Sequence, residues 1–123
     1  MKRVKTFRVI FFLYVASVVI LSVKPGQTGP DIKNIDKAWH FCAYCLMGVL
    51  SMMAFVRRWV RVSALLCSVA LGYILEWVQS FIPGRDFSYA DGAVNTIGVI
   101  FGVLVFLLFK HTFIGIHSWK GFE

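Results

Sequence analysis

Three ionisable side chains of the types that move protons stand close to long apolar stretches of the sequence: His40, Glu76 and Asp91. Imidazole and carboxylate groups act as general bases, and an arginine such as Arg85 stabilises the negative charge that develops in a transition state. We therefore take His40, Glu76 and Asp91 as candidate catalytic residues for hydrolysis or group transfer. The chain has no nucleophile motif of the G-x-S-x-G type, which counts against this chemistry.

Polar groups in the same parts of the sequence are also suited to holding a charged ligand. Lys37 and Arg85 offer cations to a phosphate or a carboxylate. Asp36, Gln79 and Asn95 are further candidate ligand-binding residues, since each lies within four residues of a candidate catalytic side chain. A binding site for a polar headgroup is therefore an alternative to an active site, and we expect no cofactor in either.

The composition identifies the elements that must position these groups. Of the 123 residues, 59% are hydrophobic and 15% are charged, and the mean hydropathy is +0.74, far from the values of soluble domains. Apolar segments long enough to cross a bilayer as helices run over residues 7–23, 39–56, 62–82 and 93–109. They predict an all-α polytopic membrane protein, a four-transmembrane-helix antiparallel bundle that forms a single domain over residues 1–123. The first segment has no A-x-A-like cleavage site, so we expect a retained helix rather than a signal peptide.

The basic residues predict how the bundle is oriented. The formal net charge is +7, but the lysines and arginines fall in short clusters between apolar segments, so we expect no nucleic-acid partner. The clusters at residues 2–8 and 57–61, together with Lys110 and Lys120, all belong to one end of a four-span bundle. The positive-inside rule makes that end cytoplasmic, and both termini with it. The partners that these charges favour are membrane lipids.

Glu76 is predicted to lie inside the membrane. It stands seven positions before the proline that ends its segment, roughly 10 Å from the outer end of its helix. A charged side chain at the membrane centre costs at least ~2.5 kcal/mol, so Glu76 should face the bundle and find partners there. The pairs Asp36–His40 and Asp91–Asn95, each spaced by four residues, begin the second and fourth helices at a comparable depth. We expect these three helix ends to form one polar junction around Glu76.

Each member of this junction also has a structural interpretation. Asp36 and Asp91 are suited to capping their helices or to complementing the positive end of the helix dipole. His40 is suited to hydrogen-bonding a neighbour at the membrane interface. A metal site built from His40, Glu76 and Asp91 is disfavoured, because no H-E-x-x-H-like spacing places two ligands on one helix. We therefore expect no metal.

Cys42 and Cys45 have the C-x-x-C spacing of redox motifs. They fall inside an apolar helix, without the strand and helix context that gives the motif its meaning. We expect these two residues and Cys67 to be buried, inert, free thiols.

Gly98 and Gly102 form a G-x-x-x-G pair in the fourth helix, and Gly72 is a candidate counterpart in the third. Small residues let two helix backbones approach closely. We expect this face to pack inside the bundle, with a homodimer contact as the alternative; the oligomeric state is left open.

The stretch DKAWHFCAYCLMG, followed by LEWVQSFIPGRDFSYADGAVNTIGVIFG, resembles the VanZ-like family of small bacterial membrane proteins, named for a protein associated with resistance to the glycopeptide teicoplanin. The resemblance covers roughly residues 36–102, and it adds Ser88 to the candidate ligand-binding residues. It implies a multi-pass protein of the bacterial cytoplasmic membrane, with a role in the cell envelope or in antibiotic resistance and with a lipid-linked cell-wall precursor or a glycopeptide as partner. The matching positions are Asp36, Lys37, His40, Glu76, Gln79, Arg85, Ser88, Asp91, Asn95 and Gly98.

Three hypotheses follow from the residues and the resemblance. In the first, an outer-leaflet polar site binds a lipid-linked or cell-envelope headgroup. In the second, the same residues form the active site of a hydrolase or transferase that acts on a lipid headgroup. In the third, the polar cluster holds the helices of an accessory subunit together. The number of ionisable groups at one depth favours the first two.

The predicted orientation is tested by labelling Ser88→Cys from the outside of intact cells, in a background without the native cysteines. The loop at residues 83–90 joins the third and fourth segments on the side with fewer basic residues, so an impermeant thiol reagent should reach it. Labelling only after the membrane is permeabilised would reverse the topology.

Overall fold

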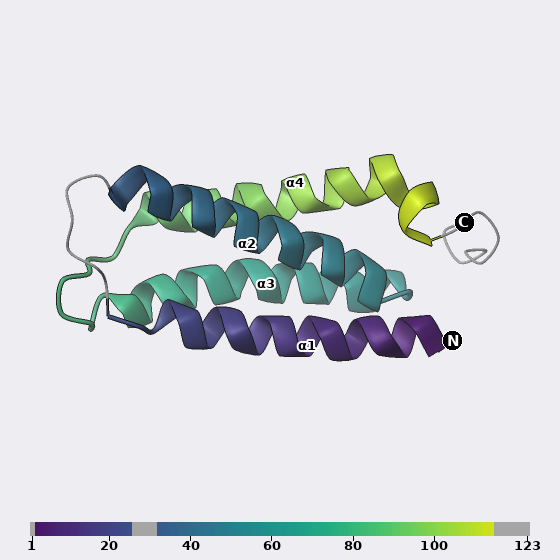
Figure 1. The fold of residues 1–123 in the computed structure, drawn as a ribbon, viewed down its shortest axis with the longest axis horizontal. Helices are drawn as coiled ribbons and strands as arrows, with labels where there is room; N and C mark the ends of the chain where they lie inside the picture. The colour runs from purple at the N-terminus through teal and green to yellow at the C-terminus, as the bar shows by residue number, and fades with distance from the viewer. Residues whose placement is uncertain (1, 26–31, 115–123) are drawn as a thin grey trace.

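The computed structural model describes residues 2–25 and 32–114, and within them every regular element is a helix. The helices are α1 (Lys2–Ser22), α2 (Ile32–Ala54), α3 (Arg58–Gln79) and α4 (Tyr89–Ile114). Successive helices run in opposite directions, so the start of α1, the end of α4 and the α2–α3 connection lie at one end of the bundle (Figure 1). The prediction of an all-α, antiparallel four-helix bundle is confirmed. Lys120 and the C-terminus lie outside the described residues.

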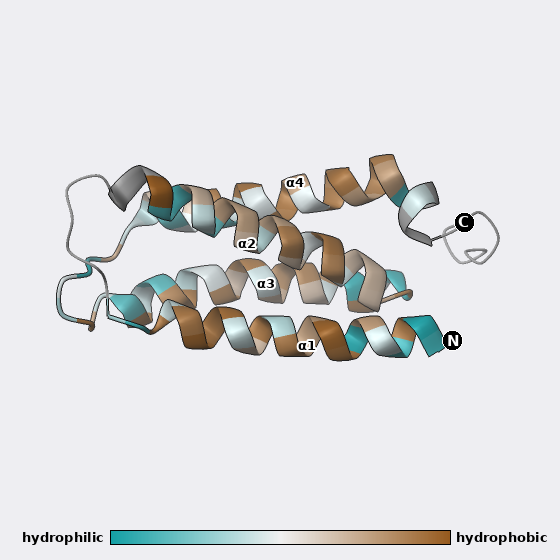
Figure 2. Cartoon of the chain, viewed as in Figure 1, coloured by the Kyte–Doolittle hydropathy of each residue, from teal (hydrophilic) through white to brown (hydrophobic). Residues whose placement is uncertain are grey.

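Three of these helices are long and apolar enough to cross a membrane: α1, α3 and residues Tyr89–Lys110 of α4. Their outward surfaces carry large apolar side chains, including Leu13, Leu66 and Leu108, and apolar residues predominate along the bundle (Figure 2). α2 is less apolar because its first turns carry Asp36, Lys37 and His40. The chain is therefore a helical membrane protein, and the crossing of the membrane by α2 stays a prediction.

The helices start before the apolar segments do. α2 begins at Ile32, and α4 begins at Tyr89, whereas the apolar segments begin at residues 39 and 93. Hydropathy marks only the residues that lipid tolerates, while the helix continues into polar turns whose backbone groups still pair within the helix. Asp36 and His40 on α2, and Asp91 and Asn95 on α4, are consequently held on helices rather than on loops.

α2 is in contact with each of the other three helices and packs most closely against α4, which runs in the same direction (Figure 1). Their backbones approach at three glycines. A methyl group added to Gly98 would lie 2.7 Å from the carbonyl oxygen of Phe41, and one added to Gly102 would collide with the backbone of Cys45. Gly48 approaches α4 in the same way, at the Val99 carbonyl. The G-x-x-x-G pair thus packs inside the bundle, as predicted.

The prediction that Gly72 is the counterpart of this glycine pair is wrong. Gly72 of α3 lies against the side chains of Asn95 and Tyr44 instead of against the glycines of α4. The true counterpart, Gly48, belongs to α2. A sequence pattern identifies a helix face that permits close approach, but it does not say which helix takes that place.

The cysteines are free, as predicted, but they are not buried in the bundle. Cys42 and Cys67 are exposed, and Cys45 is half-buried. Helical rotation turns Cys42 and Cys67 outward, where an apolar environment in the membrane suits a thiol equally well. The prediction of buried thiols is therefore wrong in position.

Two arginines complete the basic end of the bundle. Arg8 of α1 donates through Nε to the carbonyl of Ala54 at 3.1 Å, and Arg61 donates through Nε to Phe55 at 2.9 Å and through Nη2 to Val56 at 3.2 Å. The last carbonyl groups of a helix have no partner within it. Arg8 satisfies the last carbonyl of α2, and Arg61 satisfies the two carbonyls that follow the helix. Both cations also complement the negative end of the dipole of α2.

Replacing Gly102 by alanine is expected to destabilise the protein more than replacing Gly72, by roughly 1–3 kcal/mol. The methyl group at Gly102 meets the backbone of α2, whereas at Gly72 it meets the side chains of Asn95 and Tyr44 at 3.2–3.3 Å. Both changes gain the same helix propensity, so this term cancels in the comparison. Thermal unfolding of the purified proteins in detergent measures the difference. Equal stability of the two variants would contradict the close contact between α2 and α4.

Candidate functional site

Glu76 lies at the junction of three helices, near the end of the bundle that carries the α1–α2 and α3–α4 connections. Its residue surface is 2% exposed, and its Oε1 is 3.8 Å from Nδ1 of His40 on α2. The same Nδ1 is 3.0 Å from Oδ1 of Asn95 on α4, a residue that is 1% exposed. The structure thus brings His40, Glu76 and Asn95 together, as the helical spacing predicted.

The contacts of His40 determine which ring nitrogen is free. An amide oxygen only accepts hydrogen bonds, so Nδ1 of His40 carries the hydrogen that it donates to Asn95. Nε2 is then left with its lone pair in the neutral ring, 3.8 Å from Oδ2 of Asp36 and beyond hydrogen-bonding distance. This nitrogen is available to a ligand or to a reacting proton.

Two buried carboxylate oxygens lack a hydrogen-bond partner among the described residues: Oε1 of Glu76 and Oδ1 of Asp91. A buried polar atom without a partner costs of order 1–3 kcal/mol. Packing alone gives no reason to retain two such atoms, one of them 3.8 Å from a histidine. Their presence favours a site at which a proton, a water molecule or a ligand interacts with the carboxylates.

Ser88 has a structural role. It stands immediately before α4, and its Oγ accepts a hydrogen bond from the backbone N–H of Asp91 at 3.2 Å, the geometry of an N-terminal helix cap. Asp91 lies in the first turn of α4, where its charge complements the helix dipole. The capping role proposed for Asp36 is wrong, because α2 begins four residues earlier, at Ile32.

Gln79 and Arg85 turn toward α1 rather than toward Glu76. Nε2 of Gln79 donates to the carbonyl of Ser22 at 2.9 Å, and Nη1 of Arg85 approaches the same oxygen at 3.5 Å. Ser22 is the last residue of α1, so its carbonyl has no partner within the helix. The sequence placed Gln79 on the helical face of Glu76, but the side chain reaches past it to join α3 to α1.

Lys37 does not join the site. It is exposed on α2, next to Asp36 in the sequence but absent from the walls of the cavity described below. Among the described residues, Arg85 is therefore the one lysine or arginine that lines the cavity, and Lys37, the other cation that the sequence offered to a ligand, does not join it there.

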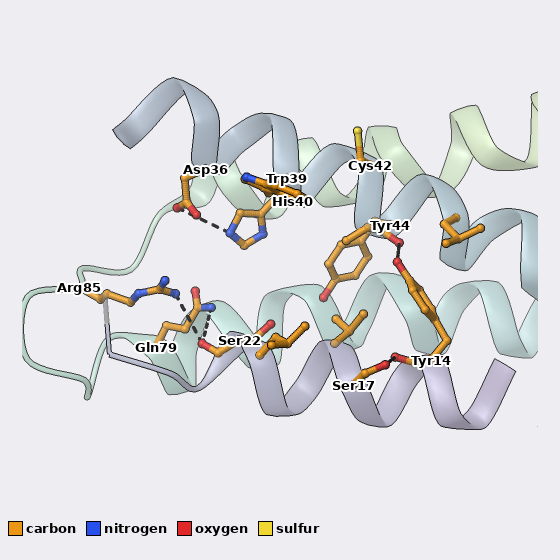
Figure 3. A pocket seen from close by; sticks show the side chains of 14 residues that line it. Tyr14, Ser17, Ser22, Asp36, Trp39, His40, Cys42, Tyr44, Gln79 and Arg85 are labelled. Carbon is orange, nitrogen blue, oxygen red and sulfur yellow. Dashed lines mark hydrogen bonds and ion pairs between the residues drawn. The ribbon is translucent and has the colours of Figure 1, made fainter. Parts of the chain in front are cut away.

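A cavity of about 470 Å³ lies between α1, α2, the end of α3 and the α3–α4 connection, a volume typical of ligand pockets. Asp36 and His40 on one side face Ser22, Gln79 and Arg85 on the other (Figure 3). The remainder of the wall is mostly apolar or aromatic. It consists of Tyr14, Ser17, Val18, Leu21, Trp39, Cys42, Ala43, Tyr44 and Leu46.

The contribution of α1 to this cavity was not predicted. Tyr14 donates its hydroxyl to the carbonyl of Ala43 at 2.8 Å, which joins α1 to α2 beside the apolar wall. The polar residues Tyr14 and Ser17 within an apolar segment are the sequence feature that could have indicated this contribution. The signal is weak, since Ser17 hydrogen-bonds only to carbonyls of its own helix, those of Leu13 and Tyr14.

No three His, Cys, Asp or Glu side chains in residues 2–25 and 32–114 are arranged to hold a metal ion. Asp36 and Glu76 contact His40 from different nitrogens, so these three groups do not converge on one point. The chemistry available at the junction is hydrogen bonding, charge pairing and proton transfer.

Most of the chain matches a known protein family. A model of the VanZ/LLP1 family matches residues 2–110. The chain belongs to the VanZ/LLP1 family. The matched region contains Asp36 and His40 of α2, Glu76 of α3 and Asn95 of α4. Searches of curated proteins and of solved structures give no match.

The tautomer of His40 is testable by nitrogen NMR of protein labelled with ¹⁵N-histidine. At alkaline pH, where an ordinary imidazole is neutral, Nδ1 should be protonated and Nε2 unprotonated, because the 3.0 Å contact to Asn95 outweighs the 3.8 Å contact to Asp36. Asn95→Leu should remove this preference, and Asn95→Asp should retain it. His40→Gln identifies the signal among the three histidines of the chain. Protonation of Nε2 in the unmodified protein would contradict the assignment.

Proposed function

We propose that this VanZ/LLP1 protein binds a membrane amphiphile, with the headgroup at the polar end of the cavity and a hydrocarbon chain along its apolar wall. The observation that carries the proposal is the chemical division of the cavity. Asp36, His40 and Arg85 gather at the end near the helix connections, whereas Val18 and Leu46 lie deeper between α1 and α2. A ligand that is polar at one end and apolar along its length complements such a wall.

The cavity also reaches the surface that lipid would cover. Three of its lining residues are largely exposed: Leu21 is 59%, Trp39 is 71% and Leu46 is 46% exposed. In a membrane these side chains face the hydrocarbon region and its boundary, so a lipid has a lateral route into the space between α1 and α2. The polar end lies at the outer leaflet in the orientation predicted from the basic residues.

Membrane lipids and lipid-linked cell-envelope precursors of the bacterial cytoplasmic membrane both have this amphiphilic form. A link to glycopeptide resistance, which the family name suggests, belongs to the same proposal, because occupation of the cavity by a lipid-linked precursor would connect the protein to the cell wall. A purely structural accessory role leaves the unpartnered oxygens of Glu76 and Asp91 without an explanation.

Catalysis on the headgroup is the second candidate, favoured by the orientation of His40. Asn95 holds Nδ1, so Nε2 is free to accept a proton from a water molecule or hydroxyl group at the polar end of the cavity. Glu76, at 3.8 Å from the same ring, would stabilise the imidazolium that results. Release of headgroup phosphate from phospholipid, dependent on His40, would distinguish a hydrolase from a binding protein.

The proposal is tested by photolabelling with a phospholipid that carries a diazirine in its acyl chain. The purified protein is mixed with this lipid, illuminated and digested, and the labelled peptides are identified by mass spectrometry. Label is expected at Val18 and Tyr44, which line the cavity and are buried, 8% and 3% exposed, and at Leu108 on the outward face of α4. Ser17→Trp, which fills the cavity, should reduce labelling of the cavity residues about tenfold or more and leave labelling of Leu108 unchanged.

Ser63→Trp is the matched control, because Ser63 is exposed on α3 and does not line the cavity. This variant should label as the unmodified protein does. If Ser17→Trp and Ser63→Trp give the same labelling at Val18 and Tyr44, the cavity does not bind the lipid and the proposal fails.

A further inference from the structure

Two opposite charges face the cavity without neutralising each other. Among the described residues that line it, Arg85 is the one lysine or arginine and Asp36 is the one carboxylate. In the described part of the chain, the single hydrogen bond of the Arg85 guanidinium goes to the Ser22 carbonyl at 3.5 Å, and no carboxylate pairs with it. The one ion-pair contact of Asp36 within the described residues is with Nε2 of His40, at 3.8 Å. Figure 3 shows the two residues on opposite sides of the polar end.

These charges exclude the simplest ligands. A headgroup with negative charge alone would lie beside Asp36, with the buried carboxylate of Glu76 just behind His40. The described residues that line the cavity supply no second lysine or arginine for such a ligand, since Lys37 lies outside it. A headgroup with positive charge alone would face Arg85. Like charges held close together repel each other in both cases.

We infer that the polar end of the cavity selects a zwitterionic headgroup that carries a phosphate and a primary amine. The inference rests on the proposed function, because it specifies the headgroup of the amphiphile. The phosphate pairs with Arg85, whose planar guanidinium matches two phosphate oxygens. The ammonium group donates to Asp36, and the exposed ring of Trp39 beside it offers a face to the same cation.

A primary amine fits better than a quaternary one for a chemical reason. The carboxylate oxygens of Asp36 accept no hydrogen bond in the described part of the chain, and a primary ammonium supplies N–H donors for them. A quaternary ammonium has no such donors and is recognised by several aromatic faces together. Trp39 is the one tryptophan among the lining residues, and Tyr44 lies deeper, 3% exposed.

The inference is tested by competition against the photoactivatable phospholipid, with phosphatidylethanolamine as the tracer. The competitors share the same acyl chains and differ only in headgroup: phosphatidylethanolamine, phosphatidylcholine and phosphatidylglycerol. Phosphatidylethanolamine should displace cavity labelling at about tenfold lower concentration than the other two, since a charge-assisted hydrogen bond contributes roughly that factor or more. Soluble glycerophosphoethanolamine should compete much more weakly, because it lacks the chain.

Two variants test whether Asp36 binds the ammonium group and Arg85 binds the phosphate. Asp36→Asn should abolish the preference for phosphatidylethanolamine over phosphatidylglycerol, with Asp86→Asn, an exposed loop carboxylate, as the unaffected control. Arg85→Gln should weaken all three phospholipids about tenfold, whereas Lys37→Gln should change none of them. Thermal unfolding of each variant verifies that it is folded, and Arg85→Lys, which keeps the cation, should lie between Arg85→Gln and the unmodified protein.

The outcomes distinguish a failure of the headgroup assignment from a failure of the proposed function. Equal competition by the three phospholipids, unchanged by Asp36→Asn, overturns the headgroup assignment and leaves amphiphile binding in place. Absence of cavity labelling by every lipid overturns the proposed function itself. Competition by glycerophosphoethanolamine as strong as that of the lipid also overturns it, because the ligand would then be a soluble compound.

Discussion

The close approach of α2 and α4 is the constraint on which the rest of the structure depends. Gly98 and Gly102 bring the α4 backbone against Phe41 and Cys45, and this contact sets how far α4 is shifted along α2. With that register, Asn95 lies beside His40 at 3.0 Å. Lipid offers little driving force for one apolar helix to bind another, so van der Waals contact between backbones carries much of the association.

α3 and α1 complete the junction in different ways. α3 delivers Glu76 to the same ring nitrogen of His40 that contacts Asn95, and Gly72 of the same helix leaves room for Asn95 and Tyr44. α1 is attached at its end by donors from Gln79 and Arg85 to the Ser22 carbonyl. Gln79 ends α3, and Arg85 lies in the connection that follows it. α1, which supplies part of the apolar wall of the cavity, is therefore held by two residues at the polar end of the cavity. Binding at Arg85 would therefore also affect the position of α1.

Charged side chains differ in their hydrogen-bond partners between the two ends of the bundle. At the basic end, Arg8 donates to the last carbonyl of α2, that of Ala54, and Arg61 donates to the carbonyl of Phe55 just beyond it, so their charges stabilise the fold. At the opposite end, Glu76 and Asp91 each retain a buried carboxylate oxygen that the described residues do not satisfy. Unsatisfied charge inside a membrane protein is expensive and is usually retained for a function. The difference between the ends supports a ligand site at one of them and a structural role for the other.

The sequence by itself determined the elements and the depth of the polar groups. Apolar segments of membrane-spanning length predict four helices, and helical spacing alone puts His40 near Asp36 and Asn95 near Asp91, because these properties are local to each helix. The burial of Glu76 followed from the cost of leaving a carboxylate in lipid. Family resemblance at the same positions agrees with the match over residues 2–110.

Only the tertiary structure decided which helix faces which, since spacing along one helix does not specify its rotation against another. Rotation turned Gln79 toward Ser22, left Lys37 and Cys42 on the outside, and matched the α4 glycines with Gly48 instead of Gly72. It also revealed that Ser88 caps α4 and that α1 supplies one wall of the cavity. A cavity is the space left between several packed helices, so its walls depend on side chains from distant parts of the chain, and no single segment of the sequence contains it.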